Sequence, residues 1–209
     1  MILLAHRGLW TEPGERNTPA AFDAALRLGF GLETDVRDQA GELVISHDVP
    51  VTPCLRLREL LARWRQGPPG TRLALNVKAD GLKERLRELL SAEETGRCFV
   101  FDMSVPETLQ YRRQGTRFFT RQSEFEPEPV LYREAAGVWL DMFTSDWARP
   151  EALRAHLDAG KEVALVSPEL HRRDPLPFWT ALRAAGLGAE PGLMLCTDLP
   201  READRFFHE

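Results

Sequence analysis

The sequence is poor in cysteine. Its 209 residues include three, Cys54, Cys98 and Cys196, an odd number without the close spacing of a zinc or iron–sulfur site. A disulfide framework and a cysteine-bound metal are therefore excluded as organising features. Cys98 and Cys196 lie in apolar runs, where a reduced, buried thiol is the expected state. A reducing compartment fits this pattern.

Long apolar runs and excess positive charge are also missing. No apolar run approaches the roughly 18 to 20 residues of a membrane span, and the apolar start MILLA is far shorter than a signal sequence. The formal net charge is -5, which argues against nucleic acid or an anionic membrane as the main partner. We therefore expect a cytoplasmic protein with a small-molecule partner, no nucleic acid and no stable membrane insertion. The oligomeric state is left open.

Short apolar runs alternate with amphipathic stretches along the whole chain. Strands are expected at residues 2–5, 31–36, 73–77, 99–101, 118–120, 138–140, 163–166 and 193–196, with an extended return arm at 43–46. Helices are expected at residues 19–28, 57–65, 81–90, 106–113, 130–135, 150–158, 177–185 and 200–206. In the first helix Thr18 is the predicted N-cap, Pro19 the first helical residue and Gly29 the stop.

This alternation predicts the fold class. About eight βα units with short connections favour an α/β protein folded as a TIM (β/α)8 barrel, a compact single domain over residues 1–209. The length is near the lower end of the range of roughly 200 to 400 residues for such barrels. An open doubly wound sheet is the alternative, but the glycine-rich dinucleotide fingerprint is absent after the first strand.

Polar and ionisable residues follow nearly every predicted strand. In a βα barrel these positions meet at one rim, where the chemistry of such folds takes place. Glu33 and Asp35 are two apart in a strand and therefore point to the same face. The two carboxylates would repel each other unless a cation lies between them, and oxygen ligands suit Mg²⁺ or Ca²⁺. The alternative is that one of the pair simply bonds Arg7 or Arg37.

His6 and His47 flank this carboxylate pair in the sequence. Imidazole titrates near neutral pH, so two such residues are candidates for a general acid and a general base. Arg7 and Lys78 would neutralise a phosphate. Cleavage of a phosphodiester needs charge neutralisation, a base for the attacking oxygen and an acid for the leaving oxygen. The predicted rim supplies all three.

Four short blocks resemble the glycerophosphodiester phosphodiesterase family. They are AHRG at 5–8, RNTPAAF at 16–22, ETDVR at 33–37 and SHD at 46–48, all in the first quarter of the chain. The resemblance implies a metal-dependent TIM barrel of lipid metabolism that hydrolyses glycerophosphodiesters to glycerol 3-phosphate and an alcohol. It further implies that His6 and His47 are the acid/base pair and that Glu33 and Asp35 are metal ligands.

The chain departs from the family pattern at two positions. Arg16 replaces the acid of the family's ENT block, and Asn76 replaces the Glu that completes the metal site. An Asn carbonyl can ligate Mg²⁺ or Ca²⁺, but it contributes a dipole where a charge is expected. Asp102, at the end of the next strand, is the candidate that restores this charge. The predicted metal set is therefore Glu33, Asp35, Asn76 and Asp102.

The second half contributes a candidate substrate pocket of Arg121, Asp141, Trp147 and Glu169. The leading hypothesis is a phosphoric diester hydrolase that uses Mg²⁺ or Ca²⁺ and two histidines. One alternative is a catalytically silent barrel that binds a phosphorylated small molecule, favoured by Asn76. A second is lyase-type cleavage by the substrate's own hydroxyl, as in phosphatidylinositol-specific phospholipase C relatives, which gives a cyclic phosphate.

Overall fold

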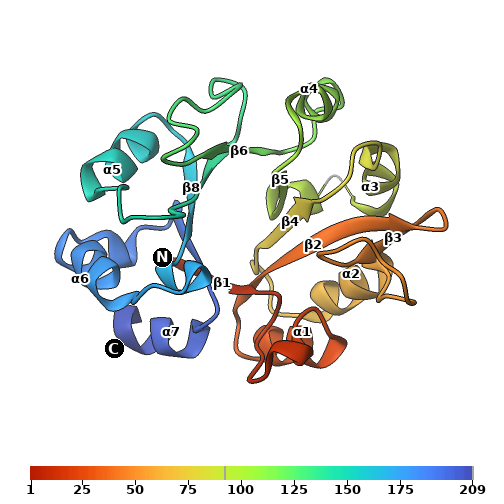
Figure 1. The fold of residues 1–209 in the computed structure, drawn as a ribbon, viewed down its shortest axis with the longest axis horizontal. Coiled ribbons are helices and arrows are strands. Elements are labelled where there is room, and N and C mark those ends of the chain that lie inside the picture. The colour runs from red at the N-terminus through yellow and green to blue at the C-terminus, as the bar shows by residue number, and fades with distance from the viewer. Residues whose placement is uncertain (92, 209) are drawn as a thin grey trace. The chain divides into compact units, whose positions relative to one another are not determined.

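The structure, a computed structural model, describes residues 1–91 and 93–208 (Figure 1). The strands are β1 (Ile2–His6), β2 (Gly31–Gln39), β3 (Glu42–Ile45), β4 (Leu73–Val77), β5 (Cys98–Phe101), β6 (Phe119–Gln122), β7 (Gly137–Leu140), β8 (Glu162–Val166) and β9 (Leu193–Thr197). The α-helices are α1 (Pro19–Arg27), α2 (Leu57–Gln66), α3 (Lys83–Leu89), α4 (Val105–Arg113), α5 (Pro150–Asp158), α6 (Leu176–Ala184) and α7 (Pro200–His208). Within residues 1–91 and 93–208, none of the helices has the length and apolar character of a membrane span.

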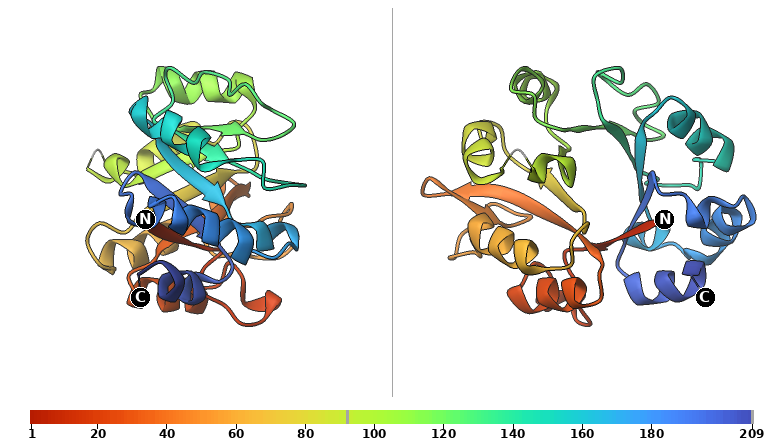
Figure 2. Two further views of the ribbon diagram at one scale, coloured as in Figure 1. Left: turned by 90° about the vertical axis from the view of Figure 1, so that its left-hand side faces the viewer. Right: turned by 180° about the vertical axis from the view of Figure 1, so that it is seen from behind.

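The chain forms two compact units. The N-unit is Ala5–Phe118; the C-unit is Met1–Leu4 together with the chain from Phe119 onwards. In the N-unit the parallel strands run in the order β5–β4–β2, and β3 pairs antiparallel with β2. Helices α1 to α4 lie along one side of these strands (Figures 1 and 2). The prediction that residues 1–209 form one domain stays a prediction.

The C-unit repeats the βα pattern with one exception. Its parallel strands run in the order β6–β7–β8–β9, and α5, α6 and α7 lie along one side of them. The helix predicted at residues 130–135 is wrong, because this segment forms turns and Leu131 has a left-handed φ of 58°. Side-chain contacts hold the segment instead: the Tyr132 hydroxyl is 2.8 Å from His156 Nδ1, and the Thr120 hydroxyl donates to the Val130 carbonyl.

Helix α1 shows why the predicted elements form. The Thr18 side chain accepts a hydrogen bond from the Ala21 N–H, and proline occupies the first turn, as the sequence predicts. The apolar face of the helix buries Phe22 and Leu26, while Gly29 with φ 81° follows the helix end. Burial of side chains this large contributes roughly 1.5 to 3 kcal/mol each. Local signals and burial therefore agree on the same element.

The three thiols are expected to differ in reactivity. Cys98 is buried, and burial raises the pKa of its thiol to about 12; Cys196 is also buried, whereas Cys54 is partly exposed. Because the thiolate is the reactive form, a thiol reagent should label Cys54 in the folded protein and all three residues after denaturation. Mass spectrometry of labelled peptides checks this, with Cys54→Ser as the control. Equally fast labelling of Cys98 in the folded protein would contradict it.

Candidate active site

The chain turns sharply at the end of β1. Arg7 has a left-handed φ of 59°, and its N–H donates to the carbonyl of Glu33 at 2.9 Å. Gly8 has a φ of 89°, and a Cβ at this position would lie 2.8 Å from the backbone and the Cβ of Ala21. Only glycine fits this close approach. The turn places the side chains of His6 and Arg7 at the carboxyl end of the strand.

Strands β2 and β4 bring three oxygen-bearing side chains to one face. Glu33 and Asp35 alternate along β2, and Asp35 is directly opposite Asn76 of β4 in the parallel register. Glu33 is 2% exposed, Asp35 1% and Asn76 9%. Lys78 follows directly after β4 and donates its backbone N–H to the carbonyl of Val36. The predicted neighbours on adjacent strand ends therefore lie together.

Burial makes Glu33 an unusual acid. The pKa of Glu33 rises from an ordinary 4.5 to about 7, chiefly because burial disfavours the charged carboxylate. His6, whose Nε2 is 3.8 Å from Glu33 Oε2, opposes this shift, and the nearby charge of Asp35 adds to it. Without a further cation, Glu33 therefore holds a proton through much of the range below pH 7.

Asp35 lies among donors and cations. Its Oδ2 is 3.0 Å from Arg7 Nε, although the two are not aligned as a hydrogen bond, and it accepts one from Asn17 Nδ2 at 3.2 Å. Its Oδ1 is 3.6 Å from the ammonium of Lys78, which lies at the same distance from Asp102 Oδ2. The alternative that Arg7 pairs with one carboxylate of β2 is thus present in the structure.

His47 lies differently from His6. The loop that carries it leaves β3 beside Asp35, whose carbonyl accepts the Ser46 N–H at 3.1 Å. The His47 side chain is 49% exposed, and its Nδ1 is 2.9 Å from Asp48 Oδ1. Its carbonyl accepts a hydrogen bond from Arg37 Nε. The structure thus brings His6 to the carboxylates of β2, and it holds His47 on the loop beside them through other contacts.

The donor set fits a hard cation only in part. Among residues 1–91 and 93–208, no three His, Cys, Asp or Glu side chains are grouped so that they could hold a metal ion. Three buried oxygens nevertheless lack a hydrogen-bond partner there: Glu33 Oε2, Asp35 Oδ1 and Asn76 Oδ1. Buried acceptors without donors are costly, and oxygen ligands of this kind suit Mg²⁺ or Ca²⁺. Asp102, the fourth predicted ligand, lies against Lys78.

Two residues near His6 were not among the predicted site residues. Asn17 contacts Asp35 directly, and its only sequence signal is the NT pair of the second block. Trp10 donates its indole N–H to the carbonyl of His6 at 3.0 Å. The guanidinium of Arg16, which replaces the acid of the family's pattern, lies 4.0 Å from the centre of the Trp10 ring. Arg16 therefore stabilises this loop through a cation–π contact with Trp10.

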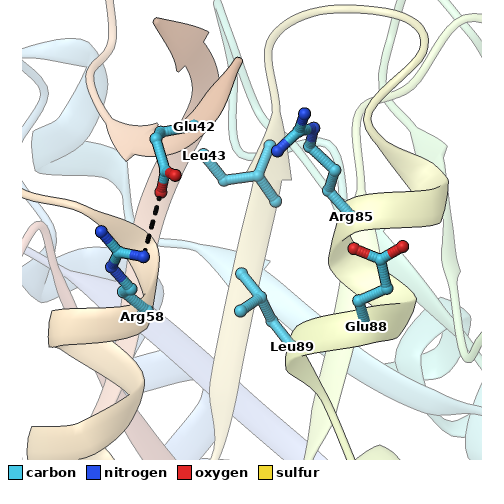
Figure 3. Close-up of a pocket in the computed structure, with 6 residues that line it drawn as sticks. All are labelled: Glu42, Leu43, Arg58, Arg85, Glu88 and Leu89. Carbon is cyan, nitrogen blue, oxygen red and sulfur yellow. Dashed lines mark ion pairs between the residues drawn. The ribbon is translucent and has the colours of Figure 1, made fainter. Parts of the chain in front are cut away.

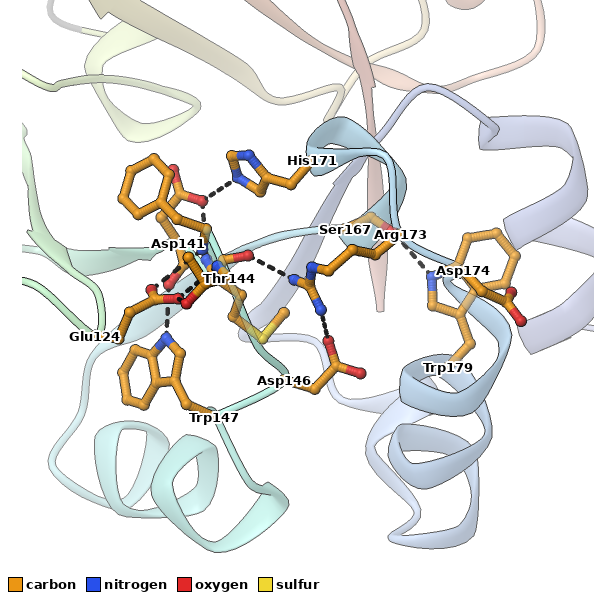
Figure 4. A network of polar contacts seen from close by, with 12 residues as sticks. Glu124, Asp141, Thr144, Asp146, Trp147, Ser167, His171, Arg173, Asp174 and Trp179 are labelled. Atoms are coloured by element: carbon orange, nitrogen blue, oxygen red, sulfur yellow. Dashed lines mark hydrogen bonds and ion pairs between the residues drawn. The ribbon is translucent and has the colours of Figure 1, made fainter.

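In the C-unit, Asp141 is the centre of a polar network (Figure 4). Its Oδ1 is 2.6 Å from His171 Nε2, and its carbonyl accepts the indole N–H of Trp147 at 2.9 Å. The Phe143 ring lies 5.0 Å from the His171 ring. Asp141 and Trp147 of the candidate pocket are thus connected, and His171 joins them although sequence reasoning did not assign it.

The other two candidate pocket residues have separate partners. Arg121 forms an ion pair with Glu126, including a hydrogen bond of 2.9 Å from Nη2 to Oε1. Glu169 Oε1 accepts hydrogen bonds from the Thr197 hydroxyl and the Asp198 N–H. These contacts connect β6 to the turn that follows it, and the segment after β8 to the end of β9. They give Arg121 and Glu169 a structural role whether or not they meet a substrate.

Comparisons with known proteins bear on the fold. No protein-family model matches the chain, and no match is found among curated protein sequences. Solved structures do match. A putative glycerophosphodiester phosphodiesterase from Galdieria sulphuraria has a TM-score of 0.76 at 16% identity, covering 100% of this chain and 98% of that one. A glycerophosphodiester phosphodiesterase from Agrobacterium tumefaciens has a TM-score of 0.73 at 18% identity, covering 100% of both chains.

The chain has the fold of a TIM-type (β/α)8 barrel. A Ca²⁺-dependent phosphatidylinositol-specific phospholipase C from Streptomyces antibioticus also matches, with a TM-score of 0.57 at 12% identity over 96% of this chain and 95% of that one. The predicted α/β barrel is therefore confirmed. The resemblance that the four sequence blocks predict, to glycerophosphodiester phosphodiesterases, is matched by structural similarity over the whole chain.

A surface cavity of the N-unit lies away from all predicted site residues. It has a volume of about 180 Å³ and lies between β3, α2 and α3 (Figure 3). Its lining residues are Glu42, Leu43, Arg58, Arg85, Glu88 and Leu89. The two arginines and two glutamates balance in charge, and Arg58 already pairs with Glu42 at 3.5 Å. The cavity therefore has no surplus charge with which to select an anion or a cation.

Proposed function

We propose that the site on β1, β2 and β4 binds a small phosphodiester and hydrolyses it with the help of a divalent cation. One observation carries the proposal: cationic donors and buried acceptors meet here without satisfying each other. Within the described part of the chain, the buried Nε of Arg7 has no hydrogen-bond partner, and the Lys78 ammonium lies 3.6 Å from each neighbouring carboxylate. A phosphate would accept from these donors, while a cation would satisfy the buried oxygens.

Glu33, Asp35 and Asn76 are the residues that would hold the cation. When bound, Mg²⁺ or Ca²⁺ supplies electrophilic stabilisation of the charge on the phosphoryl oxygens. Glu33 must lose its proton to take part, and its raised pKa makes this loss dependent on pH near neutrality. Asn76 lowers the charge of the site relative to a third carboxylate. We expect a cation affinity weaker than that of a site with three acids.

The two histidines are assigned the proton transfers. One takes a proton from the attacking water, and the other gives a proton to the oxygen of the leaving alcohol; the products are a phosphomonoester and an alcohol. His6 Nε2 lies 3.8 Å from Glu33 Oε2, at the edge of the proposed cation site. His47 is oriented by Asp48. Which histidine acts as the base and which as the acid is left open.

The substrate class is proposed from the family resemblance. Structural neighbours named as glycerophosphodiester phosphodiesterases support a glycerophosphodiester as the first substrate to test, and one neighbour is named as Ca²⁺-dependent. A place in lipid metabolism and in the cytoplasm follows from this proposal and from the composition. The candidate pocket of Arg121, Asp141, Trp147 and Glu169 stays a proposal for contacts to the alcohol portion.

The test is an assay of purified protein on glycerophosphodiesters with Mg²⁺, Ca²⁺ or Mn²⁺, and with a chelator as the control. We expect cation-dependent release of a phosphomonoester, and a loss of at least about 100-fold in His6→Ala and in His47→Ala. His156→Ala, in the C-unit, is the matched histidine control. Release that is indifferent to His6→Ala and His47→Ala would overturn the proposed roles.

Two outcomes distinguish the alternatives. Binding of glycerol phosphate without turnover under any divalent ion would show a silent barrel, which the Asn76 substitution favours. A cyclic phosphate, detected by phosphorus NMR before any linear phosphomonoester, would show attack by the substrate's own hydroxyl. Direct appearance of the phosphomonoester supports hydrolysis.

A further inference from the structure

Asn17 connects the two strand ends of the site. Its backbone N–H donates to the Arg7 carbonyl at 2.9 Å, and its side-chain Nδ2 donates to Asp35 Oδ2 at 3.2 Å. Its Oδ1 accepts from the Thr34 hydroxyl at 2.8 Å. Thr34 is fully buried, so this donor has a fixed position. The side chain of Asn17 thus links two neighbouring residues of β2 through its donor and acceptor ends, while its backbone N–H bonds Arg7, the residue directly after β1.

The backbone around Asn17 is held in a less common conformation. Asn17 has a φ of 60°, and Arg7, to which it bonds, has a φ of 59°. Residues other than glycine adopt this left-handed region at a cost, and they keep it where surrounding contacts impose it. The hydrogen bond between the two residues is one such contact. The loop therefore presents Arg7 through an arrangement that depends on Asn17.

We propose that Asn17 is a positioning residue: it prevents a hydrogen bond between the Asp35 carboxylate and the Arg7 guanidinium, so that Arg7 stays available to the phosphate. This inference rests on the proposed function. Arg7 Nε and Asp35 Oδ2 are 3.0 Å apart yet misaligned, and the amide of Asn17 already donates to that oxygen. Arginine and carboxylate otherwise favour aligned bidentate pairs. Without the amide, the carboxylate is free to turn and form such a pair.

Thr34 sets the direction of the Asn17 amide. An asparagine side chain has one acceptor end and one donor end. The Thr34 hydroxyl donates to the acceptor end, which leaves the donor end directed at Asp35. Loss of the hydroxyl would allow the amide to rotate and present its oxygen to a carboxylate. Thr34 is therefore also a positioning residue, which acts on Asp35 and Arg7 through the Asn17 amide.

The experiment measures binding of inorganic phosphate by calorimetry, beside kcat and KM on a glycerophosphodiester. Asn17→Gly suits the left-handed backbone and removes the amide; Asn17→Asp keeps the shape and places a carboxylate against Asp35. We expect the Kd for phosphate and the KM to rise about tenfold or more in both, the size of a lost hydrogen bond to a charged group. Thr34→Val should also raise the Kd and the KM, whereas Thr34→Ser, which keeps the hydroxyl, should have wild-type values.

Ala40→Gly is the matched control. Ala40 has a φ of 50° in the turn between β2 and β3, so this variant also puts glycine at a left-handed position of the N-unit. It should leave phosphate binding unchanged. Thermal unfolding of every variant shows whether weaker phosphate binding comes from a loss of folded protein or from misplaced Arg7 and Asp35 side chains.

The two failures are distinguishable. If the wild type binds phosphate and Asn17→Gly and Asn17→Asp bind it equally well, the positioning role is overturned while the proposed function stands. If Thr34→Ser and Thr34→Val behave alike, control of the amide by the hydroxyl is overturned. If the wild type binds no phosphate and cleaves no diester, the proposed function fails and this inference fails with it.

Discussion

Asp35→Asn is expected to lower the free energy of unfolding by about 3 kcal/mol, because removal of one partner of a buried charge cluster leaves the others uncompensated. Asp35 is 1% exposed and has Arg7 at 3.0 Å and Lys78 at 3.6 Å. The same change removes a proposed cation ligand, so turnover should fall by at least about 100-fold. Asparagine has the shape of aspartate, which limits the effect to charge and hydrogen bonding.

Denaturant unfolding and the diester assay check this prediction. Inorganic phosphate should raise the stability of Asp35→Asn more than that of the wild type, because the anion takes the place of the lost charge between Arg7 and Lys78. Asp23→Asn is the matched control: Asp23 pairs with Arg63, but both side chains are 37% exposed, and the expected cost is below about 1 kcal/mol. Equal costs in the two variants would show that Asp35 is not in a cluster of buried charge.

Glu33→Gln is expected to stabilise the protein above neutral pH. The pKa of Glu33 is raised from 4.5 to about 7 by burial, so the folded state binds a proton that the unfolded state releases between these values. Stability therefore falls as the pH rises from about 4.5 to about 7 and stays low above that range. A neutral glutamine avoids this loss. At about pH 8 the gain should be about 3 kcal/mol, and near pH 4 it should vanish.

The measurement is denaturant unfolding at both pH values with a chelator present, because a divalent cation would compensate the carboxylate. Glu94→Gln is a matched control of opposite sign. A hydrogen bond from Arg65 lowers the pKa of Glu94 to about 2, so its stabilisation is present above about pH 4.5 and is lost as the pH falls towards 2. Glu94→Gln should therefore lose stability at about pH 8. A pH-independent effect of Glu33→Gln would contradict the raised pKa.

The parts predicted correctly from the sequence depend on short-range patterns. The helix at α1 is encoded by Thr18, Pro19 and a periodic apolar face, all within a few residues of one another. The shared face of Glu33 and Asp35 follows from the alternation of a strand. The order of strands and helices gave the barrel, because few folds accept about eight consecutive βα units. The helix expected at residues 130–135 failed where contacts between distant residues, such as Tyr132 with His156, replaced the local pattern.

Properties that depend on several strands at once were not predicted from the sequence. Glu33 is a weak acid only because the folded chain excludes water from it and brings Asp35 near, and no local pattern specifies burial to that degree. The pairing of Asp141 with His171, 30 residues apart, is of the same kind.

The sequence by itself determined most of the helices and strands and which chemical groups stand at their ends, since both depend on spacings of two to four residues. Only the tertiary structure decided which of those groups meet, which are buried and which already have partners. The reason is physical: charge, burial and hydrogen bonding depend on distances through space, and Asn17 and Asp35 become neighbours only when the chain has folded.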